Sequence, residues 1–403
     1  MALMPVEEAL ARVLDAAEPL PAEFIAVATA HERVLAADLV ARRTQPPGDV
    51  SAMDGYAVRA ADVASTPARL TLIGEAAAGS VFFGTVGPRQ AARILTGALV
   101  PDGADTVVIQ ENCRRDGDVV IIEKGERPGR HIRRAGLDFV EGEARLPAGR
   151  RLTVRDLALA AAMNHAVVPA RRRPRVAVIS TGDELMSPGS PLSPGQIVSS
   201  NGPSLAAMAR AEGAQALDLG IVPDRLEDTV AATRRARDWG ADVLLTTGGA
   251  SVGDYDLVQP ALAAEGMQLA FWKVALRPGK PLMHGRLGAM RVLGLPGNPV
   301  SAYVCALLFM VPLVRRLAGR SDALLATEDA TLGRDLPEND ERQDYLRSRL
   351  SAAPGDGRIA IPLDVQDSSM MRALAEADCL VIRAPHAPAA KIGDPCKIIL
   401  LRH

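Results

Sequence analysis

Aromatic residues are scarce in this chain of 403 residues, at 3% of the total. Proteins that bind single-stranded nucleic acid stack the bases on aromatic side chains, so this scarcity argues against that class. The formal net charge is −2, which provides no overall positive field for nucleic acid or for an anionic membrane. We therefore expect neither a nucleic acid nor a membrane as a partner.

Cysteine and histidine are also few. The four cysteines form no C-x-x-C pair and the six histidines form no H-E-x-x-H motif, so a zinc site is not expected. This usage favours reduced thiols and a cytoplasmic location. A signal peptide begins with a basic segment and continues with an apolar one, whereas this chain has the acids Glu7 and Glu8 there. We therefore do not expect a signal peptide. The longest apolar run, 302–314, is shorter than the roughly 20 residues that span a membrane, so we expect a buried helix there.

The length of the chain suggests about two to four domains. The pattern of apolar residues divides the chain into four parts. Residues 1–43 and 141–170 are predicted to form one elongated, discontinuous domain in which helices at 6–17 and 153–163 pack together. Residues 44–140 contain short β-like segments and form an inserted β domain. Residues 171–320 alternate strands with helices, which predicts an α/β domain with a doubly wound, mostly parallel sheet. Residues 321–403 are predicted to form a small β domain similar to a barrel.

The stretch 243–256 is the most unusual part of the predicted α/β domain. An apolar strand changes there into two glycines, several hydroxyl side chains and the aspartates Asp254 and Asp256. Glycine lets backbone N–H groups approach a phosphate closely, and carboxylates are hard ligands for a divalent cation. A Gly-Gly pair after a strand is also typical of a plain turn. Taken alone, the stretch leaves both interpretations open.

Two further strands of this domain are predicted to end in comparable loops. One loop is T-G-D-E at 181–184, and the other is G-L-P-G-N-P at 294–299, where Asn298 is a suitable N-cap and Pro299 fits the first helical position. Ligands of open α/β sheets bind beyond the carboxyl ends of the strands, so we expect the three loops to meet. A helix N-terminus with glycine beside it binds anions, and the gathered carboxylates call for a cation such as Mg²⁺.

Three more features have alternative interpretations. Lys273, Arg277 and Lys280 lie on a Pro-Gly turn, which suits an oxyanion site or a plain exposed basic turn. Asp54-Gly55 is typical of a hairpin turn, or places the Asp54 carboxylate on an exposed loop tip. Three arginines within 130–134 suit a solvated loop or a clamp for phosphate-like oxygens. The chain has no Walker A loop and no G-x-G-x-x-G, which excludes the ordinary P-loop and dinucleotide-binding enzymes.

Five motifs occur in a fixed order along the chain. They are S-A-M-D-G-Y-A-V at 51–58, T-G-D-E-L at 181–185, T-G-G-A-S-V-G-D-Y-D at 247–256, R-P-G-K-P at 277–281 and G-L-P-G-N-P-V-S at 294–301. Together they resemble the molybdopterin molybdenumtransferase (MoeA) family, which is related to the E domain of gephyrin. The first motif separates this family from the stand-alone molybdopterin adenylyltransferases, which share only the T-G-D-E and P-G-N-P parts. The C-terminal domain resembles the family least.

The resemblance implies a cytoplasmic homodimer of elongated, four-domain subunits. Its substrates would be adenylylated molybdopterin and molybdate, and the adenylyl group would be hydrolysed with release of AMP in a Mg²⁺-dependent reaction. The active site would lie between the α/β domain of one subunit and the inserted β domain of the other. A transient contact with the adenylyltransferase is also implied. The alternatives are a molybdopterin adenylyltransferase and a non-catalytic scaffold like the gephyrin E domain.

The resemblance also implies roles for individual residues. The expected catalytic residues are Asp54, Asp138, Glu184 and Asp256, and Asp54, Glu184 and Asp256 would also hold Mg²⁺. The expected substrate-binding residues are Thr96, Arg133, Thr181, Gly182, Thr247, Gly248, Gly249, Ser251, Gly253, Pro296, Gly297, Asn298 and Pro299. The expected molybdate-binding residues are Lys273, Arg277, Lys280, Ser368 and Ser369. Two positions depart from the family pattern: Arg277 stands where lysine is usual, and Leu137 stands before Asp138 where an acid is usual.

Overall fold

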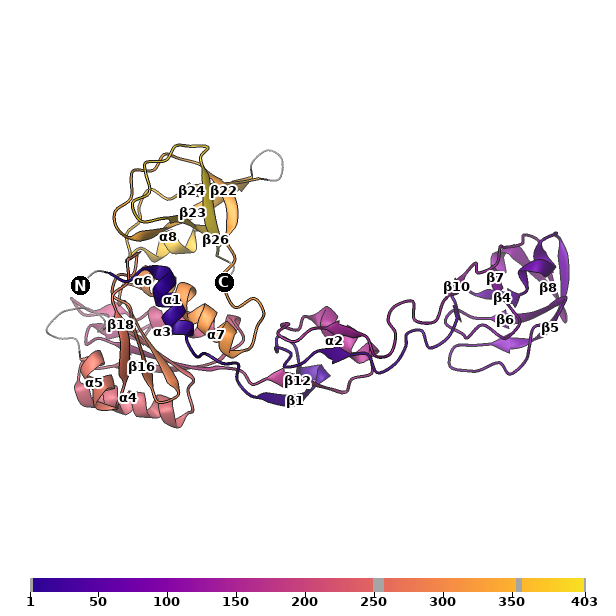
Figure 1. The fold of residues 1–403 in the computed structure, drawn as a ribbon, viewed down its shortest axis with the longest axis horizontal. Helices are drawn as coiled ribbons and strands as arrows, with labels where there is room; N and C mark the ends of the chain where they lie inside the picture. Colours follow the sequence, from indigo (N-terminus) through magenta and orange to yellow (C-terminus); the bar gives the residue numbers. More distant parts are fainter. Residues whose placement is uncertain (1–2, 249–256, 353–356, 402–403) are drawn as a thin grey trace.

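The computed structural model describes residues 3–248, 257–352 and 357–401 of an elongated molecule (Figure 1). The α/β domain and a C-terminal barrel lie together at one end, a small domain follows in the middle, and a β domain lies at the other end. The first and last described residues both lie at the end that holds the α/β domain.

A six-stranded sheet forms the centre of the α/β domain. Its strands, in spatial order, are β16 (Gln215–Val222), β13 (Arg175–Thr181), β17 (Val243–Thr247), β21 (Met290–Leu295), β20 (Met283–Leu287) and β18 (Gln268–Trp272). The first four are parallel, and β20 runs antiparallel to both of its neighbours. The predicted doubly wound, mostly parallel sheet is therefore confirmed. Strand β20 was not predicted, because M-H-G-R-L lacks the continuous apolar pattern of a buried strand.

Helices cover both faces of this sheet. One face packs against α3 (Asn201–Ala211) and a continuous helix made of α6 (Pro299–Cys305), the π-helical turn η4 (Ala306–Met310) and α7 (Val311–Leu317). The other face packs against α4 (Leu226–Asp238) and α5 (Val258–Ala264). The helix 299–317 is long and apolar enough to cross a membrane by length and composition alone, yet 83% of its apolar window is buried inside the fold. This burial is typical of a core helix and agrees with the prediction.

Helix α1 (Val6–Leu14) packs where the sequence did not predict. Its buried residues Val6, Ala9 and Val13 belong to the core that also contains α3, α6 and α7. The predicted packing of this helix against the one at 153–163 is therefore wrong. The spacing of its apolar residues shows which face is buried, but it holds no information about the element that covers that face.

The middle domain is built from two pairs of strands and one helix. Strand β1 (Ala22–Ala26) pairs with β12 (Val167–Arg171), and β2 (Leu39–Val40) pairs with β11 (Ala144–Leu146). The chain thus leaves and re-enters this domain through paired strands, with the β domain inserted between them. Helix α2 (Val154–Ala162) begins at the predicted N-cap Thr153, which forms a capping box with Asp156.

The inserted β domain is a six-stranded sheet with a small strand pair beside it. The strands of the sheet, in spatial order, are β7 (Thr106–Ile109), β4 (Gly55–Val58), β6 (Gln90–Ile94), β5 (Ala68–Ala76), β9 (Val119–Ile122) and β8 (Cys113–Asp116). The small pair consists of β3 (Val50–Ser51) and β10 (Ile132–Arg133). Gly55 begins β4, because a Cβ there would lie 2.0 Å from the carbonyl oxygen of Val108 on β7. Asp54 therefore lies on a loop tip before a strand, and not in a hairpin turn.

The C-terminal domain is a closed five-stranded barrel. Its strands close in the order β23 (Gln343–Ala352), β24 (Arg358–Pro362), β22 (Glu328–Leu332), β26 (Pro395–Leu400), β25 (Cys379–Arg383) and back to β23. A short strand of the α/β domain, β19 (Leu276–Arg277), pairs with β23, and α8 (Met371–Ala375) contacts α6. Tyr345, Leu380 and Ile399 of this domain belong to the main core of the α/β domain. The two domains therefore share one apolar core.

Candidate functional site

The three predicted strand-end loops leave adjacent strands. Strands β13, β17 and β21 are neighbours in the sheet, and Thr247 pairs with Ser180 on one side and with Leu295 on the other. The chain passes from β13 to β16 in one direction and from β16 back past β13 to β17 in the other. The strand order thus reverses between β13 and β17, which is where open α/β sheets bind ligands. The three loops therefore begin at one edge of the sheet, as expected.

Asn201, which the sequence did not single out, connects these loops. It is the first residue of α3, and its side-chain amide donates to the carbonyl oxygen of Gly297 at 2.8 Å and to the hydroxyl of Thr247 at 3.4 Å. The Thr181 hydroxyl donates to the carbonyl oxygen of Thr247 at 3.4 Å. Asn201 precedes Gly202 and Pro203, a pair that is typical of a loop. Its position beside a glycine and a proline was the available signal.

Gly248 allows the first and second loops to approach closely. Its φ of +89° lies in the left-handed region, and a Cβ at this position would lie 2.3 Å from the carbonyl oxygen of Thr181. A Cβ on Gly297 would be 3.7 Å from the Cα of Gly248. The three loops thus bring main-chain groups together in a space that a side chain would occupy, as an oxyanion site requires.

Carboxylates collect beside this edge. Asp183 and Glu184 follow β13 as predicted, and Asp224 joins them from the loop after β16. The N–H of Asp224 donates to Asp183 Oδ1 at 3.1 Å. Burial, reinforced by the charges of Asp183 and Glu184, raises the pKa of Asp224 above its ordinary value. The sequence missed Asp224, because D-R-L-E-D reads there as an ordinary helix start.

The remaining residues of the second loop are not described. Gly249, Ser251, Gly253 and Asp256 lie outside the described residues. Within 3–248, 257–352 and 357–401, no three His, Cys, Asp or Glu side chains are grouped closely enough to hold a metal ion. The hard oxygen donors beside β13 suit Mg²⁺ chemically, but the described part of one chain does not complete a ligand set.

The third loop is completed by the barrel. Asn298 occupies the N-cap position and Pro299 the first helical position, as predicted, but the Asn298 side chain accepts no helix N–H. Its amide donates instead to Ser368 Oγ at 2.8 Å, and the N–H of Val300 donates to the carbonyl oxygen of Ser368 at 3.0 Å. The predicted N-cap position is confirmed, but the acceptor for the N–H of Val300 is the carbonyl oxygen of Ser368, 70 positions after Asn298, and not the Asn298 side chain.

The barrel also places a buried arginine near this helix start. Arg347 on β23 is 1% exposed, and its Nε has no hydrogen-bond partner among the described residues. Its Nη2 donates to the carbonyl oxygen of Asp367 at 3.3 Å, next to the predicted pair Ser368 and Ser369. Burial lowers the pKa of Arg347, and the carboxylates of Asp367 and Asp344 oppose that shift. Neither motif matching nor apolar spacing draws attention to this residue, since it lies inside an ordinary strand pattern.

Ser368 and Ser369 have different surroundings although they are adjacent. Ser368 contacts the start of α6, as described above. The hydroxyl and the N–H of Ser369 both donate to Asp367 Oδ1, at 2.6 and 2.7 Å, and these donors lower the pKa of Asp367. Ser368 is therefore the serine that the structure brings to the third loop.

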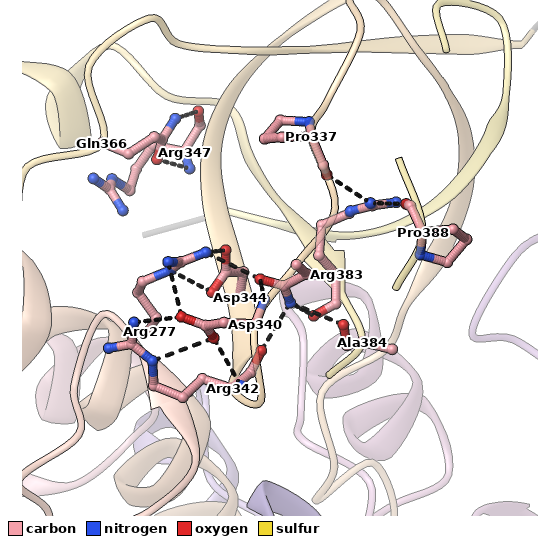
Figure 2. Close-up of polar contacts among 11 residues, drawn as sticks. Arg277, Pro337, Asp340, Arg342, Asp344, Arg347, Gln366, Arg383, Ala384 and Pro388 are labelled. Atoms are coloured by element: carbon pink, nitrogen blue, oxygen red, sulfur yellow. Dashed lines mark hydrogen bonds and ion pairs between the residues drawn. The ribbon is translucent and has the colours of Figure 1, made fainter. Parts of the chain in front are cut away.

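The basic turn lies between the α/β domain and the barrel. The N–H of Lys273 donates to the carbonyl oxygen of Leu282, and the N–H of Val274 donates to that of Lys280, so the turn is closed on itself. Lys273 lies over the ring of Trp272 at 5.5 Å. Lys273 and Lys280 form no ion pair with any residue in the described part of the chain. Arg277, by contrast, donates to carboxylates of the barrel (Figure 2).

The predicted residues of the inserted β domain form a separate cluster. Asp54 Oδ1 accepts hydrogen bonds from the N–H of Thr96 at 2.7 Å and from its hydroxyl at 2.9 Å. These two donors, the N–H first, lower the pKa of Asp54 below its ordinary value. Arg133 on β10 pairs with Val50, just before the Asp54 loop. Asp138 lies where the chain returns to the middle domain, with its N–H bonded to the carbonyl oxygen of Gln45.

The arginine-rich segment 130–134 is only partly engaged. Arg134 forms an ion pair with Asp49, and Arg130 lies 3.9 Å from Glu126. Arg133 is exposed and forms no ion pair with a described residue. The segment therefore offers one exposed guanidinium without an ion pair among the described residues, and both interpretations of it stay open.

One chain does not bring the two clusters together. The β domain lies at the far end of the molecule from the α/β domain (Figure 1). Asp54, Thr96 and Arg133 are therefore remote from Glu184, Gly248 and Gly297 of the same chain. A site that uses both clusters requires a second copy of the chain.

Comparison with known proteins identifies the family. Three family profiles match: "MoeA N-terminal region (domain I and II)" at residues 4–164, "Probable molybdopterin binding domain" at 177–316 and "MoeA C-terminal region (domain IV)" at 329–401. The molybdopterin molybdenumtransferase of Bacillus subtilis (strain 168) is 33% identical over 99% of this chain and 94% of its own length. The one from Haemophilus influenzae is 36% identical over 100% and 99%.

A solved structure gives the same result. The crystal structure of the "molybdopterin biosynthesis moea protein from Pyrococcus horikosii" superposes with a TM-score of 0.85 at 30% identity and covers 100% of both chains. Sequence and fold thus agree over the whole length of the chain. The chain belongs to the molybdopterin molybdenumtransferase (MoeA) family.

Proposed function

We propose that this transferase transfers molybdenum from molybdate to adenylylated molybdopterin, with hydrolysis of the adenylyl group and release of AMP. Insertion of molybdenum into molybdopterin for cofactor biosynthesis is the function of the family to which the chain belongs. The observation that favours it in this chain is the meeting of three glycine-containing loops at the switch point of the sheet. The full-length relatives are named molybdenumtransferases, which favours this activity over adenylyl transfer or a scaffold role.

The phosphate groups of the substrate would bind at the strand-end loops. The approach of Gly248 to Thr181 leaves main-chain groups accessible to an oxyanion, and Asn201 fixes the position of the third loop. The hydroxyl of Thr247 offers a further donor. These groups are held before substrate arrives, so little reorganisation is needed when charge develops on the phosphate.

Molybdate would bind where the basic turn, the start of α6 and the barrel meet. It is a tetrahedral dianion and requires cationic and hydroxyl donors. Lys273 and Lys280 supply ammonium groups without described carboxylate partners, and Ser368 lies against the start of α6. Arg347 adds a buried guanidinium with an unpartnered Nε. A cation without a competing carboxylate attracts a dianion more strongly than a paired cation does.

Mg²⁺ would be held by carboxylates of both clusters. Glu184 on one chain and Asp54 on the other are the proposed ligands, with Asp256 as a third. When bound, the cation would offset the negative charge of the phosphoanhydride. Asp54 is suited to this role because the Thr96 donors lower its pKa, so that its carboxylate stays ionised at neutral pH. It would also orient the water that hydrolyses the anhydride.

The site would be completed by dimerisation. In a two-fold dimer, the β domain of each subunit would approach the α/β domain of the other. Such a protein would work in the cytoplasm and would take adenylylated molybdopterin from the adenylyltransferase through a transient contact.

Mixing two inactive variants tests the shared site. Asp54→Ala and Glu184→Ala should each fold and form dimers but lose turnover of adenylylated molybdopterin with molybdate. After denaturation and joint refolding, half of the dimers are mixed, and each mixed dimer has one intact site. Activity should therefore return to about one quarter of the wild-type value. Refolding each variant alone is the control. No recovery in a verified mixed dimer would exclude a site shared between subunits.

A further inference from the structure

We propose that Arg277 is a positioning residue that fastens the barrel to the α/β domain, and that it is not a ligand of molybdate. This inference rests on the proposed function, in which molybdate binds where these two domains meet. The resemblance to the family placed Arg277 in the molybdate pocket, at a position where lysine is usual. The structure gives its guanidinium other partners.

All three nitrogens of the Arg277 guanidinium are engaged by the barrel (Figure 2). Nε donates to Asp344 Oδ1 at 2.6 Å, and Nη2 donates to the other oxygen of the same carboxylate. Nη1 donates to Asp340 Oδ2 at 3.2 Å, and Nη2 also donates to Asn339 Oδ1 at 3.0 Å. The hydrogen bond to Asp344 is the main cause of the raised pKa of Arg277. Four of the five N–H donors of the guanidinium are therefore already used by the barrel.

The acceptors of Arg277 are themselves held in place. The Asp344 side chain is 5% exposed, so loss of Arg277 would leave a buried carboxylate unpaired. The Asn339 amide donates at 2.8 Å to the carbonyl oxygens of Arg342 and Ala384, on two different segments of the barrel. Asp340 accepts from Arg342 at 2.6 Å, and the Arg342 contacts hold its pKa at about 2. The acceptor set is thus fixed, and the lowered pKa of Asp340 keeps that carboxylate ionised at neutral pH.

Charge also argues against molybdate at Arg277. The carboxylates of Asp344 and Asp340 balance the charges of Arg277 and Arg342, so an arriving dianion would find no unpaired positive charge at Arg277. Lys273 and Lys280 lie on the same turn and form no ion pair with a described residue. The turn therefore divides its cations between two tasks: the lysines are available to an oxyanion, and the arginine serves the barrel.

The contact between Arg277 and Asp344 has a direct structural consequence for the molybdate pocket. Arg277 and Asp344 are register partners in the pairing of β19 with β23, and β23 continues to Arg347. The same barrel supplies Ser368 to the start of α6. A planar guanidinium binds a carboxylate through two parallel hydrogen bonds, whereas a lysine ammonium acts as a single point charge. This explains why an arginine suits the position.

Molybdate binding to the full-length protein, measured by calorimetry, tests this role. Asp344→Asn and Arg277→Lys each break the bidentate contact between the guanidinium and the carboxylate, and each keeps a side chain of similar shape. Each should weaken molybdate binding by about 5- to 20-fold, and the double variant should lose no more than either single variant, because both remove one contact. The control is Asp364→Asn, which breaks the exposed Arg334–Asp364 pair of the same barrel and should leave binding unchanged.

If Arg277 were a direct ligand of molybdate, Asp344→Asn would change the affinity for molybdate in the opposite direction. That change removes a negative charge and frees the guanidinium, so a ligand role for Arg277 would make binding tighter or leave it equal, which overturns the proposal. Amide hydrogen exchange should show faster exchange at the β19–β23 pairing in Arg277→Lys, with an unchanged melting transition of the β domain. If the wild-type protein binds no molybdate, the proposed function fails and this inference fails with it. Wild-type binding that Asp344→Asn leaves intact refutes the positioning role alone.

Discussion

Replacing Gly248 with alanine would change the closest backbone approach at the site. The residue has a φ of +89°, and the added Cβ would lie 2.3 Å from the carbonyl oxygen of Thr181, about 0.7 Å short of the 3.0 Å limit that real Cβ contacts respect. Alanine in the left-handed region costs about 1–2 kcal/mol. Steric overlap with backbone adds about 1–3 kcal/mol. We expect the free energy of unfolding of the α/β domain to fall by about 2–5 kcal/mol.

The same change should affect catalysis more than stability. The overlap is relieved only if the ends of β13 and β17 move apart, and these ends form the proposed phosphate site. A displacement near 1 Å costs about 100-fold in rate when groups must be aligned. The measurement is kcat/KM for conversion of adenylylated molybdopterin and molybdate at a temperature where circular dichroism shows the variant to be folded.

Gly266→Ala is the matched control for this substitution. Gly266 has a φ of +91° in the same domain, but no atom lies within 4 Å of its added Cβ. It therefore has the same backbone cost without the steric overlap. Comparing the two variants isolates the approach of Gly248 to Thr181. If Gly248→Ala retained the activity of Gly266→Ala, the argument that this approach shapes the site would be refuted.

Three other substitutions test the electrostatics of the fold and the site. Glu212→Gln should lower the free energy of unfolding by about 3 kcal/mol in denaturant titrations, because this 1% exposed carboxylate pairs with two arginines. Burial lowers the pKa of His284 from 6.5 to about 4, so the wild type should lose about 3 kcal/mol of stability as pH falls through this range, whereas His284→Leu should not. Thr96→Val removes one donor to Asp54, so the pKa of that carboxyl should rise and the acidic limb of the kcat/KM profile should move to higher pH. An unchanged limb would exclude Asp54 as the group that titrates there.

Features that depend on neighbouring residues were predictable from the sequence. The strands of the central sheet have continuous apolar runs, and the loops after them change abruptly to glycine, hydroxyl and acidic residues. The N-cap Thr153 was predictable because its partner Asp156 is three residues away. In each case the interaction that decides the structure lies within one turn or one strand.

Features that depend on distant residues were not predictable. Asn298 has the right composition and position for a helix cap, yet its amide is turned to Ser368 of the barrel. Helix α1 has a clear apolar face, but the sequence does not show that α6 and α7 cover it. Asp224 joins Asp183 only because β16 and β13 are neighbours in the sheet.

The basic turn shows most clearly the difference between what neighbouring residues determine and what distant residues determine. Its sequence alone determined that Lys273, Arg277 and Lys280 lie on one turn, because only eight residues, with a Pro-Gly pair among them, span the three. The tertiary structure alone decided which of these charges remain available, since the carboxylates that neutralise Arg277 come from residues 63 and 67 positions later. Local geometry follows from neighbouring residues, whereas the electrostatic potential at a site is the sum over every charge that the fold brings near it.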